Sequence, residues 1–127
     1  MNIPEPFWCT PEVKKNLRNL INFHYDVATY NEKLKRLSAG PMIKQFLENV
    51  EAQETKRSKV KMYLYGGHDT NIAHLLRALG IKDQVKSVLE VPYYVSAIIF
   101  EKVRDNKNQI YIKVNQIFII TSFSKNI

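Results

Sequence analysis

The sequence predicts an α/β fold in which helices come first, a strand, loop and helix follow, and a β-hairpin comes last. Apolar residues recur at helical spacing before residue 57. They alternate with polar or aromatic residues over Val60–Tyr65, as in a strand, and alternation returns in two short runs after residue 94. With 127 residues, 45% of them hydrophobic, the chain is globular in composition.

The helical part opens with a clear start signal. Thr10 offers a capping hydroxyl, Pro11 suits the first helical position, and Glu12 lies beside the positive end of the dipole. The pattern predicts a long helix broken near Thr29, and then a second helix that opens at Gly40-Pro41. The apolar positions of the first helix, where we expect His24 to pack structurally, are Val13, Leu17, Leu20, Ile21, His24, Val27, Ala28, Leu34 and Leu37.

The next unit places two functional side chains on a turn. Val60, Met62 and Leu64 alternate as a buried strand requires, and an amphipathic helix then runs to Leu79 with Gly80 as its stop. The helix repeat consists of Ile72, Ala73, Leu75, Leu76 and Leu79, and His74 is expected to pack or cap there. His68 and Asp69 therefore fall between a strand end and a helix start, where free N–H groups and the helix dipole favour an anion. Gly66 and Gly67 let a ligand approach the backbone closely.

The last part predicts a hairpin. Strands are expected over Val95–Phe100 and Ile110–Val114, joined by a charged turn at residues 104–108. Residues 81–90 are expected to connect the helix to the hairpin through a short amphipathic turn. The apolar, β-prone tail from residue 117 to residue 127 fits no expected element.

Several of these runs resemble the histidine acid phosphatases, the group that includes prostatic, lysosomal and insect venom enzymes. Tyr65-Gly-Gly-His-Asp-Thr70, with the leucine-rich helix after it, is similar to the His-Asp motif of that family. Val91-Pro-Tyr-Tyr-Val-Ser-Ala-Ile-Ile-Phe-Glu101 is similar to the family's proline-tyrosine segment. Upstream, residues 30–43 resemble its helix, glycine and second helix. The likeness covers roughly residues 5–116.

The resemblance implies a partial histidine phosphatase, or phosphoglycerate mutase-like, fold as one partial domain over residues 1–127. Residues 10–57 would form mainly a helical cap segment, and residues 58–116 a sheet segment with the His-Asp loop. It implies hydrolysis of phosphate monoesters with Asp69 as the proton donor and His68 as a phosphate contact. Gly67 and Thr70 are expected to contact the substrate, and no metal or cofactor is expected.

One family motif is missing from these 127 residues. The family's nucleophile is a histidine in an Arg-His-Gly motif, and none of His24, His68 and His74 has arginine before it or glycine after it. We therefore expect the chain to supply only the acid half of a site, to be part of a longer protein, and to self-associate through exposed apolar surface. The resemblance implies a secreted or lysosomal protein, although no signal peptide opens the sequence. The single Cys9 excludes a disulfide within the chain.

Other interpretations of the His-Asp turn stay open. The chain could be a non-catalytic remnant that only binds phosphate or pairs with another chain. His68 and Asp69 could be metal ligands of a phosphohydrolase, although no further ligand lies at a suitable spacing. Asp69 could simply cap the helix that follows it. The net charge of +7 comes from scattered lysines, which does not favour nucleic-acid binding, and no run is long enough to cross a membrane.

Overall fold

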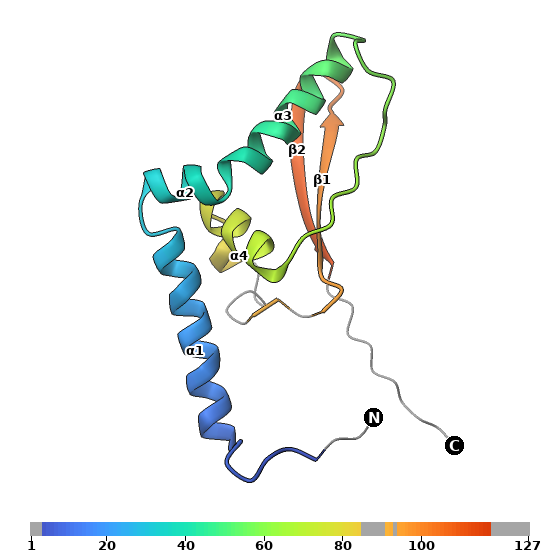
Figure 1. Ribbon diagram of the computed structural model, residues 1–127. Helices are drawn as coiled ribbons and strands as arrows, with labels where there is room; N and C mark the ends of the chain where they lie inside the picture. The colour runs from blue at the N-terminus through green and yellow to red at the C-terminus, as the bar shows by residue number, and fades with distance from the viewer. Residues whose placement is uncertain (1–3, 85–90, 93, 118–127) are drawn as a thin grey trace, which may run out of the picture.

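The computed structural model describes residues 4–84, 91–92 and 94–117 (Figure 1). Helices form the first part of the chain and a β-hairpin forms the last, which confirms the predicted α/β class. The elements are α1 (Pro11–Ala28), α2 (Glu32–Ser38), α3 (Gly40–Glu54), α4 (Asp69–Ala78), the 3₁₀ helix η1 (Lys82–Gln84), β1 (Ala97–Arg104) and β2 (Ile110–Ile117).

The helix boundaries follow the local signals in the sequence. Thr10 Oγ1 accepts a hydrogen bond from Val13 N at 3.3 Å, so the predicted cap of α1 is confirmed. The predicted break is confirmed too, because α1 ends at Ala28 and Asn31 caps α2 by accepting from Leu34 N at 2.9 Å. The predicted second helix begins at Gly40 as α3.

Gly80 ends α4 as predicted. It has a φ of +68°, the left-handed conformation that glycine adopts without steric cost. Its N–H donates to Arg77 O at 3.1 Å, and Ile81 N–H donates to Leu76 O at 3.0 Å. These two bonds satisfy carbonyls at the end of α4, and they form the double hydrogen-bond pattern that closes many helices at a glycine.

The predicted strand over Val60–Tyr65 is wrong. Within the described chain, no backbone hydrogen bond joins residues 59–67 to another backbone group, and the described sheet consists of β1 and β2 alone. Met62 is 69% exposed and Leu64 88% exposed, so this run is not buried either. Alternation specifies an extended backbone, but a strand also needs a neighbour to pair with, and a single run of sequence cannot supply one.

The hairpin is confirmed and is longer than predicted. β1 and β2 pair antiparallel from Ala97 with Ile117 to Arg104 with Ile110. The predicted start at Val95 is wrong, because Val95 has a φ of +64° and lies in a turn before β1. At the other end the turn is closed by Asp105, whose Oδ1 accepts from Lys107 N at 2.9 Å and from Gln109 N at 2.8 Å.

The hairpin lies beside α3 (Figure 1). The rings of Phe46 and Phe100 are 5.1 Å apart, and Glu54 forms ion pairs with Lys102 and Arg104, each at 2.6 Å. Burial in the described residues is concentrated elsewhere, where α4 packs against α1 and α2. The buried apolar residues are Tyr25, Ala39, Ala73, Leu75 and Leu76.

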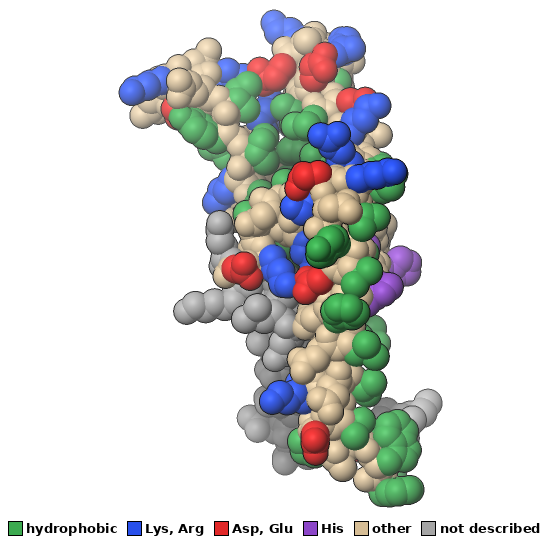
Figure 2. Space-filling view, turned by 90° about the vertical axis from the view of Figure 1, so that its left-hand side faces the viewer, with side chains coloured by type: hydrophobic (Ala, Val, Ile, Leu, Met, Phe, Trp, Pro, Cys, Tyr) green, Lys and Arg blue, Asp and Glu red, His purple; other side chains and the backbone are tan. Residues whose placement is uncertain are grey.

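The buried face of α1 is not its apolar face. Tyr25 is 2% exposed and Thr29 5% exposed, whereas Leu20 is 62% exposed. Hydrophobic side chains reach the surface along α1, which faces the viewer in Figure 2. His24 is exposed, so the expectation that it lies on the packed face is wrong. The reason is that α4 meets α1 only near its carboxyl end, on the side of Tyr25, so the apolar stripe has no partner among the described residues.

Two predicted segments lie largely outside the described residues. The expected turn within residues 81–90 begins as η1, and residues 85–90 are not described. The unassigned tail lies outside the described residues from 118 onward.

Candidate active site

The site is built on the amino end of α4. His68 is the residue before the helix, with an extended backbone, and Asp69 is the first helical residue. His68 N–H donates to Asn71 Oδ1 at 2.9 Å, which satisfies one donor at the helix start. Asp69 and Thr70 begin this helix, and the interpretation of Asp69 as its capping residue is wrong because His68 holds that position.

Gly67 lies close to the side chain of Asn71. A Cβ at position 67 would lie 3.2 Å from Asn71 Oδ1, so a side chain there would push on the amide that caps His68. Gly66 has no such neighbour within 4 Å. The backbone of Gly67 therefore runs close to α4 and remains exposed beside His68.

The Asp69 carboxylate is held by two hydrogen bonds. Its Oδ1 accepts from Thr70 N at 2.8 Å, and its Oδ2 accepts from the Tyr25 hydroxyl at 2.9 Å. The first is local to the helix start, whereas the second comes from α1. The side chains of His68 and Asp69 are otherwise exposed.

The Tyr25 hydroxyl stays protonated at acid and neutral pH. Burial, followed by the hydrogen bond to Asp69, raises the pKa of Tyr25 to about 12. Its hydroxyl is therefore neutral and can donate to the Asp69 carboxylate at acid and neutral pH. The ring is contacted on its face by Arg77, whose Cζ lies 5.3 Å from the ring centroid, and by the edge of His74 at 6.1 Å between centroids.

Arg77 joins the residues around Tyr25 into one cluster, which consists of Tyr25, Asp26, His74 and Arg77. Its side chain is 5% exposed, and its Nε donates to Asp26 Oδ1 at 2.7 Å. Lys82 also donates to Asp26 Oδ1, at 2.8 Å. Burial alone would raise the pKa of Asp26, but the hydrogen bonds from Lys82 and Arg77 outweigh it and hold the pKa below its ordinary value.

His74 packs in the same cluster, as predicted. Burial, together with the nearby charge of Arg77, lowers the pKa of His74, so the neutral imidazole is favoured. In the described residues its Nε2 is buried with no hydrogen-bond partner. The ring of His74 packs against that of Tyr25 within this cluster.

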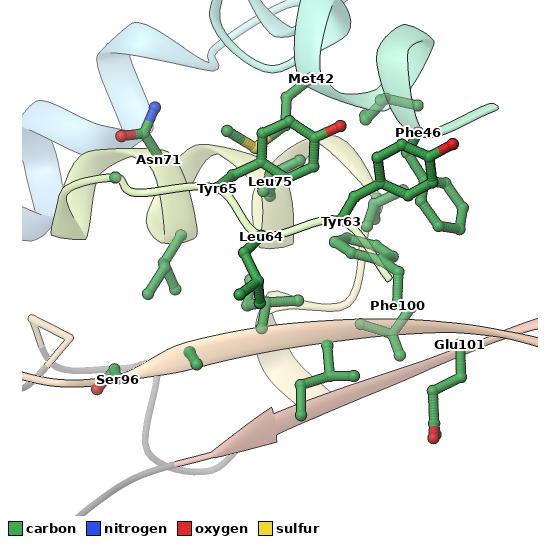
Figure 3. Close-up of a pocket in the computed structure, with 18 of the residues that line it drawn as sticks. Met42, Phe46, Tyr63, Leu64, Tyr65, Asn71, Leu75, Ser96, Phe100 and Glu101 are labelled. Carbon is green, nitrogen blue, oxygen red and sulfur yellow. The ribbon is translucent and has the colours of Figure 1, made fainter. Parts of the chain in front are cut away.

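A large cleft of about 1720 Å³ opens next to the His-Asp turn. Its walls come from α3, the extended segment 60–67, α4 and β1 (Figure 3). Leu64 points across the cleft toward β1, while Tyr63 and Tyr65 point toward α3. The lining is mainly apolar, with Met42, Phe46, Leu75 and Phe100 among its residues.

Three of the four predicted site residues reach this cleft. Gly67, His68 and Asp69 line it, whereas Thr70 does not. Tyr25 was not predicted from the sequence. The apolar repeat of α1 pointed to its neighbour His24 instead. Only the contact between α1 and α4 brings Tyr25 to Asp69.

The family follows from a comparison of sequences. Residues 9–115 match the sequence model of the histidine phosphatase superfamily (branch 2). The chain belongs to this superfamily. The matched range contains every element from α1 to most of β2, including the His-Asp turn and Tyr25.

Curated members of the superfamily are similar to parts of the chain. The venom acid phosphatase of Apis mellifera is 35% identical over 81 residues, which are 62% of this chain and 20% of the relative. The prostatic acid phosphatase of Rattus norvegicus is 27% identical over 109 residues, covering 83% of this chain and 27% of the relative. The lysosomal acid phosphatase of Bos taurus is 29% identical over 82 residues, covering 62% of this chain and 19% of the relative. The chain thus spans about a quarter or less of their length, and no solved structure matches it.

Two features are absent from the described part of the chain. No three or more His, Cys, Asp or Glu side chains gather there in a group able to hold a metal ion. No helix in the same part of the chain combines the length and apolar character that crossing a membrane requires.

Proposed function

We propose that the chain supplies the acid half of a phosphomonoester hydrolase site at the start of α4. In this proposal Asp69 is the proton donor, His68 contacts the phosphoryl group, and Gly67 and Thr70 bind the substrate. Residues 10–57 form the helical cap segment, and residues 58–116 form the sheet segment that carries the site. The protein is secreted or lysosomal, which the names of the venom and lysosomal relatives support.

The observation that carries the proposal is the position of His68 and Asp69. They occupy the last residue before α4 and its first residue, and both line the same cleft. The partial positive charge of a helix amino end attracts a phosphoryl group, and exposed backbone at Gly67 allows a close approach. The apolar cleft beside them would receive the organic part of the ester.

Asp69 is suited to the role of the acid. When the bond from phosphorus to the ester oxygen breaks, its electron pair stays on that oxygen, which needs a proton to leave as an alcohol or phenol. A protonated Asp69 would give that proton and become a carboxylate. The Thr70 N–H and the Tyr25 hydroxyl would then stabilise the carboxylate.

The nucleophile of the reaction is not among the residues proposed above. In the family it is a histidine that becomes phosphorylated, and it lies in an Arg-His-Gly motif that these 127 residues do not contain. We therefore propose that this chain alone does not complete the reaction. A non-catalytic chain that only binds phosphate is the second candidate, and the same exposed helix start supports it.

An external nucleophile separates these two candidates. Imidazole added at high concentration can attack phenyl phosphate in place of the missing histidine, forming N-phosphoimidazole and releasing phenol. If Asp69 acts as an acid, the protein should accelerate phenol release at acid pH, and Asp69→Asn should remove that acceleration. Asp105→Asn, in the hairpin turn, is the matched control. Phenol release no faster than with Asp69→Asn would leave only the phosphate-binding function.

A further inference from the structure

We propose that Tyr25 is the positioning residue for Asp69, holding its carboxylate in one orientation from the neighbouring helix α1. The proposal rests on the proposed role of Asp69 as the acid, and it adds a residue to that site. It is carried by one contact between distant parts of the chain, the hydrogen bond of 2.9 Å from the Tyr25 hydroxyl to Asp69 Oδ2.

Without Tyr25, the side chain of Asp69 would have little to hold it. Asp69 is exposed at the first position of α4, where an aspartate samples several rotamers. Its other hydrogen bond, from Thr70 N, comes from the next residue in the chain. Such a local contact holds one oxygen, but it does not fix the carboxylate relative to the rest of the protein.

Tyr25 can fix the orientation of the Asp69 carboxylate because its own side chain is held in place. It is 2% exposed, and its ring contacts the guanidinium of Arg77 and forms a T-shaped pair with the ring of His74. Arg77 is held in turn by Asp26, the residue after Tyr25, through the contact of 2.7 Å. The Tyr25 hydroxyl thus belongs to a cluster of side chains that joins α1 to α4.

The chemistry of a tyrosine hydroxyl suits this task. A phenol can donate to a carboxylate and can also accept from a carboxylic acid, so the contact survives when Asp69 gains or gives its proton. Because the phenol stays neutral throughout the acid range, it adds no charge that would repel or compete for a phosphoryl group. It therefore orients Asp69 without taking part in the proton transfer.

The test measures the orientation of Asp69 directly. Three-bond couplings from the carboxyl carbon of Asp69 to its backbone nitrogen and carbonyl carbon report its χ1 angle. In the wild type we expect values of a single rotamer. In Tyr25→Phe, which keeps the ring, we expect averaged values at Asp69 and unchanged values at Asp105. Tyr30→Phe is the matched control, because Tyr30 is 84% exposed and should leave Asp69 unchanged.

Two results with Tyr25→Phe would overturn the proposal. One is a Tyr25→Phe protein in which the Asp69 couplings stay at their wild-type values. The other is averaging at Asp105 as well, which would indicate general loosening. Should Tyr25→Phe not fold, the wild type still decides: a Tyr25 hydroxyl proton that exchanges as fast as that of Tyr30 would also overturn it. None of these readouts depends on phosphate binding or turnover, so a failure here is distinct from a failure of the proposed function.

Discussion

Arg77 Nε and Asp26 Oδ1 lie 2.7 Å apart, in an ion pair that joins α4 to the carboxyl end of α1. The arginine is almost fully buried, while the aspartate is about half exposed, with 49% of its side chain accessible. An unpaired guanidinium inside the protein is costly, so removing the Asp26 carboxylate alone should destabilise the fold.

We predict that Asp26→Asn lowers the free energy of unfolding by about 2 kcal/mol, less than for a fully buried pair because solvent screens the aspartate. The matched control is Glu32→Gln, since Glu32 pairs with Lys35 at 2.8 Å with 79% of its side chain exposed. We expect that control to leave the free energy of unfolding nearly unchanged, because solvent screens an exposed ion pair. Urea denaturation measures both. Equal losses in the two variants would show that the pair does not secure α4 to α1.

The second prediction concerns stability in acid. His74 has a lowered pKa in the fold, so the unfolded chain binds a proton more readily than the folded one. The stability that neutral His74 contributes is present above its pKa in the unfolded chain, which is about 6.5. It is lost as the pH falls through the lower pKa of His74 in the folded state. The free energy of unfolding should therefore fall between pH 7 and pH 5. His74→Phe should flatten this dependence, because phenylalanine has no group that titrates. If the free energy of unfolding of His74→Phe depends on pH as that of the wild type does, His74 is not the group responsible.

The helix boundaries could be predicted because their signals are local. The hydroxyl of Thr10 and the left-handed backbone of Gly80 act within a few residues, so their effect can be read from a short stretch of sequence. The His-Asp turn could be placed for the same reason, since it lies directly before the helix that ends at Gly80.

The rest of the site depended on contacts between distant segments. Val60–Tyr65 has the alternation of a strand, but no local pattern says which strand would pair with it. Tyr25 was missed because the apolar repeat of α1 passes through Leu17, Leu20 and Val27, and α4 packs on another side of the helix. Only the three-dimensional structure shows that Tyr25 and Asp69, 44 residues apart, share a hydrogen bond.

The third prediction is the absence of turnover without an added nucleophile. The purified chain should hydrolyse an aryl phosphate at acid pH no faster than the double variant His68→Ala, Asp69→Ala. The physical reason is that neither residue is proposed to attack phosphorus. Release of inorganic phosphate is the measurement. Metal-independent turnover clearly above that of the double variant would mean that the attacking residue lies within these 127 residues.

The fourth prediction concerns association. Leu64 is 88% exposed and lines the apolar cleft, so burying it against a second copy of the chain should be favourable. We expect concentration-dependent association in sedimentation velocity, weakened by Leu64→Lys. Leu37→Lys is the matched control, because Leu37 is 67% exposed but does not line the cleft. A monodisperse monomer with one cooperative unfolding transition would contradict this prediction.

The most direct test of the central claim is a titration of the ¹⁵N-labelled chain with inorganic phosphate at mildly acid pH. If the start of α4 is the phosphate site, the largest shifts should fall on the amides of Gly67, His68, Asp69 and Thr70. His68→Ala should weaken binding about tenfold, the loss of a contact worth about 1.4 kcal/mol, while His24→Ala should bind as the wild type does. Shifts centred elsewhere, or equal affinity in His68→Ala, would contradict the account.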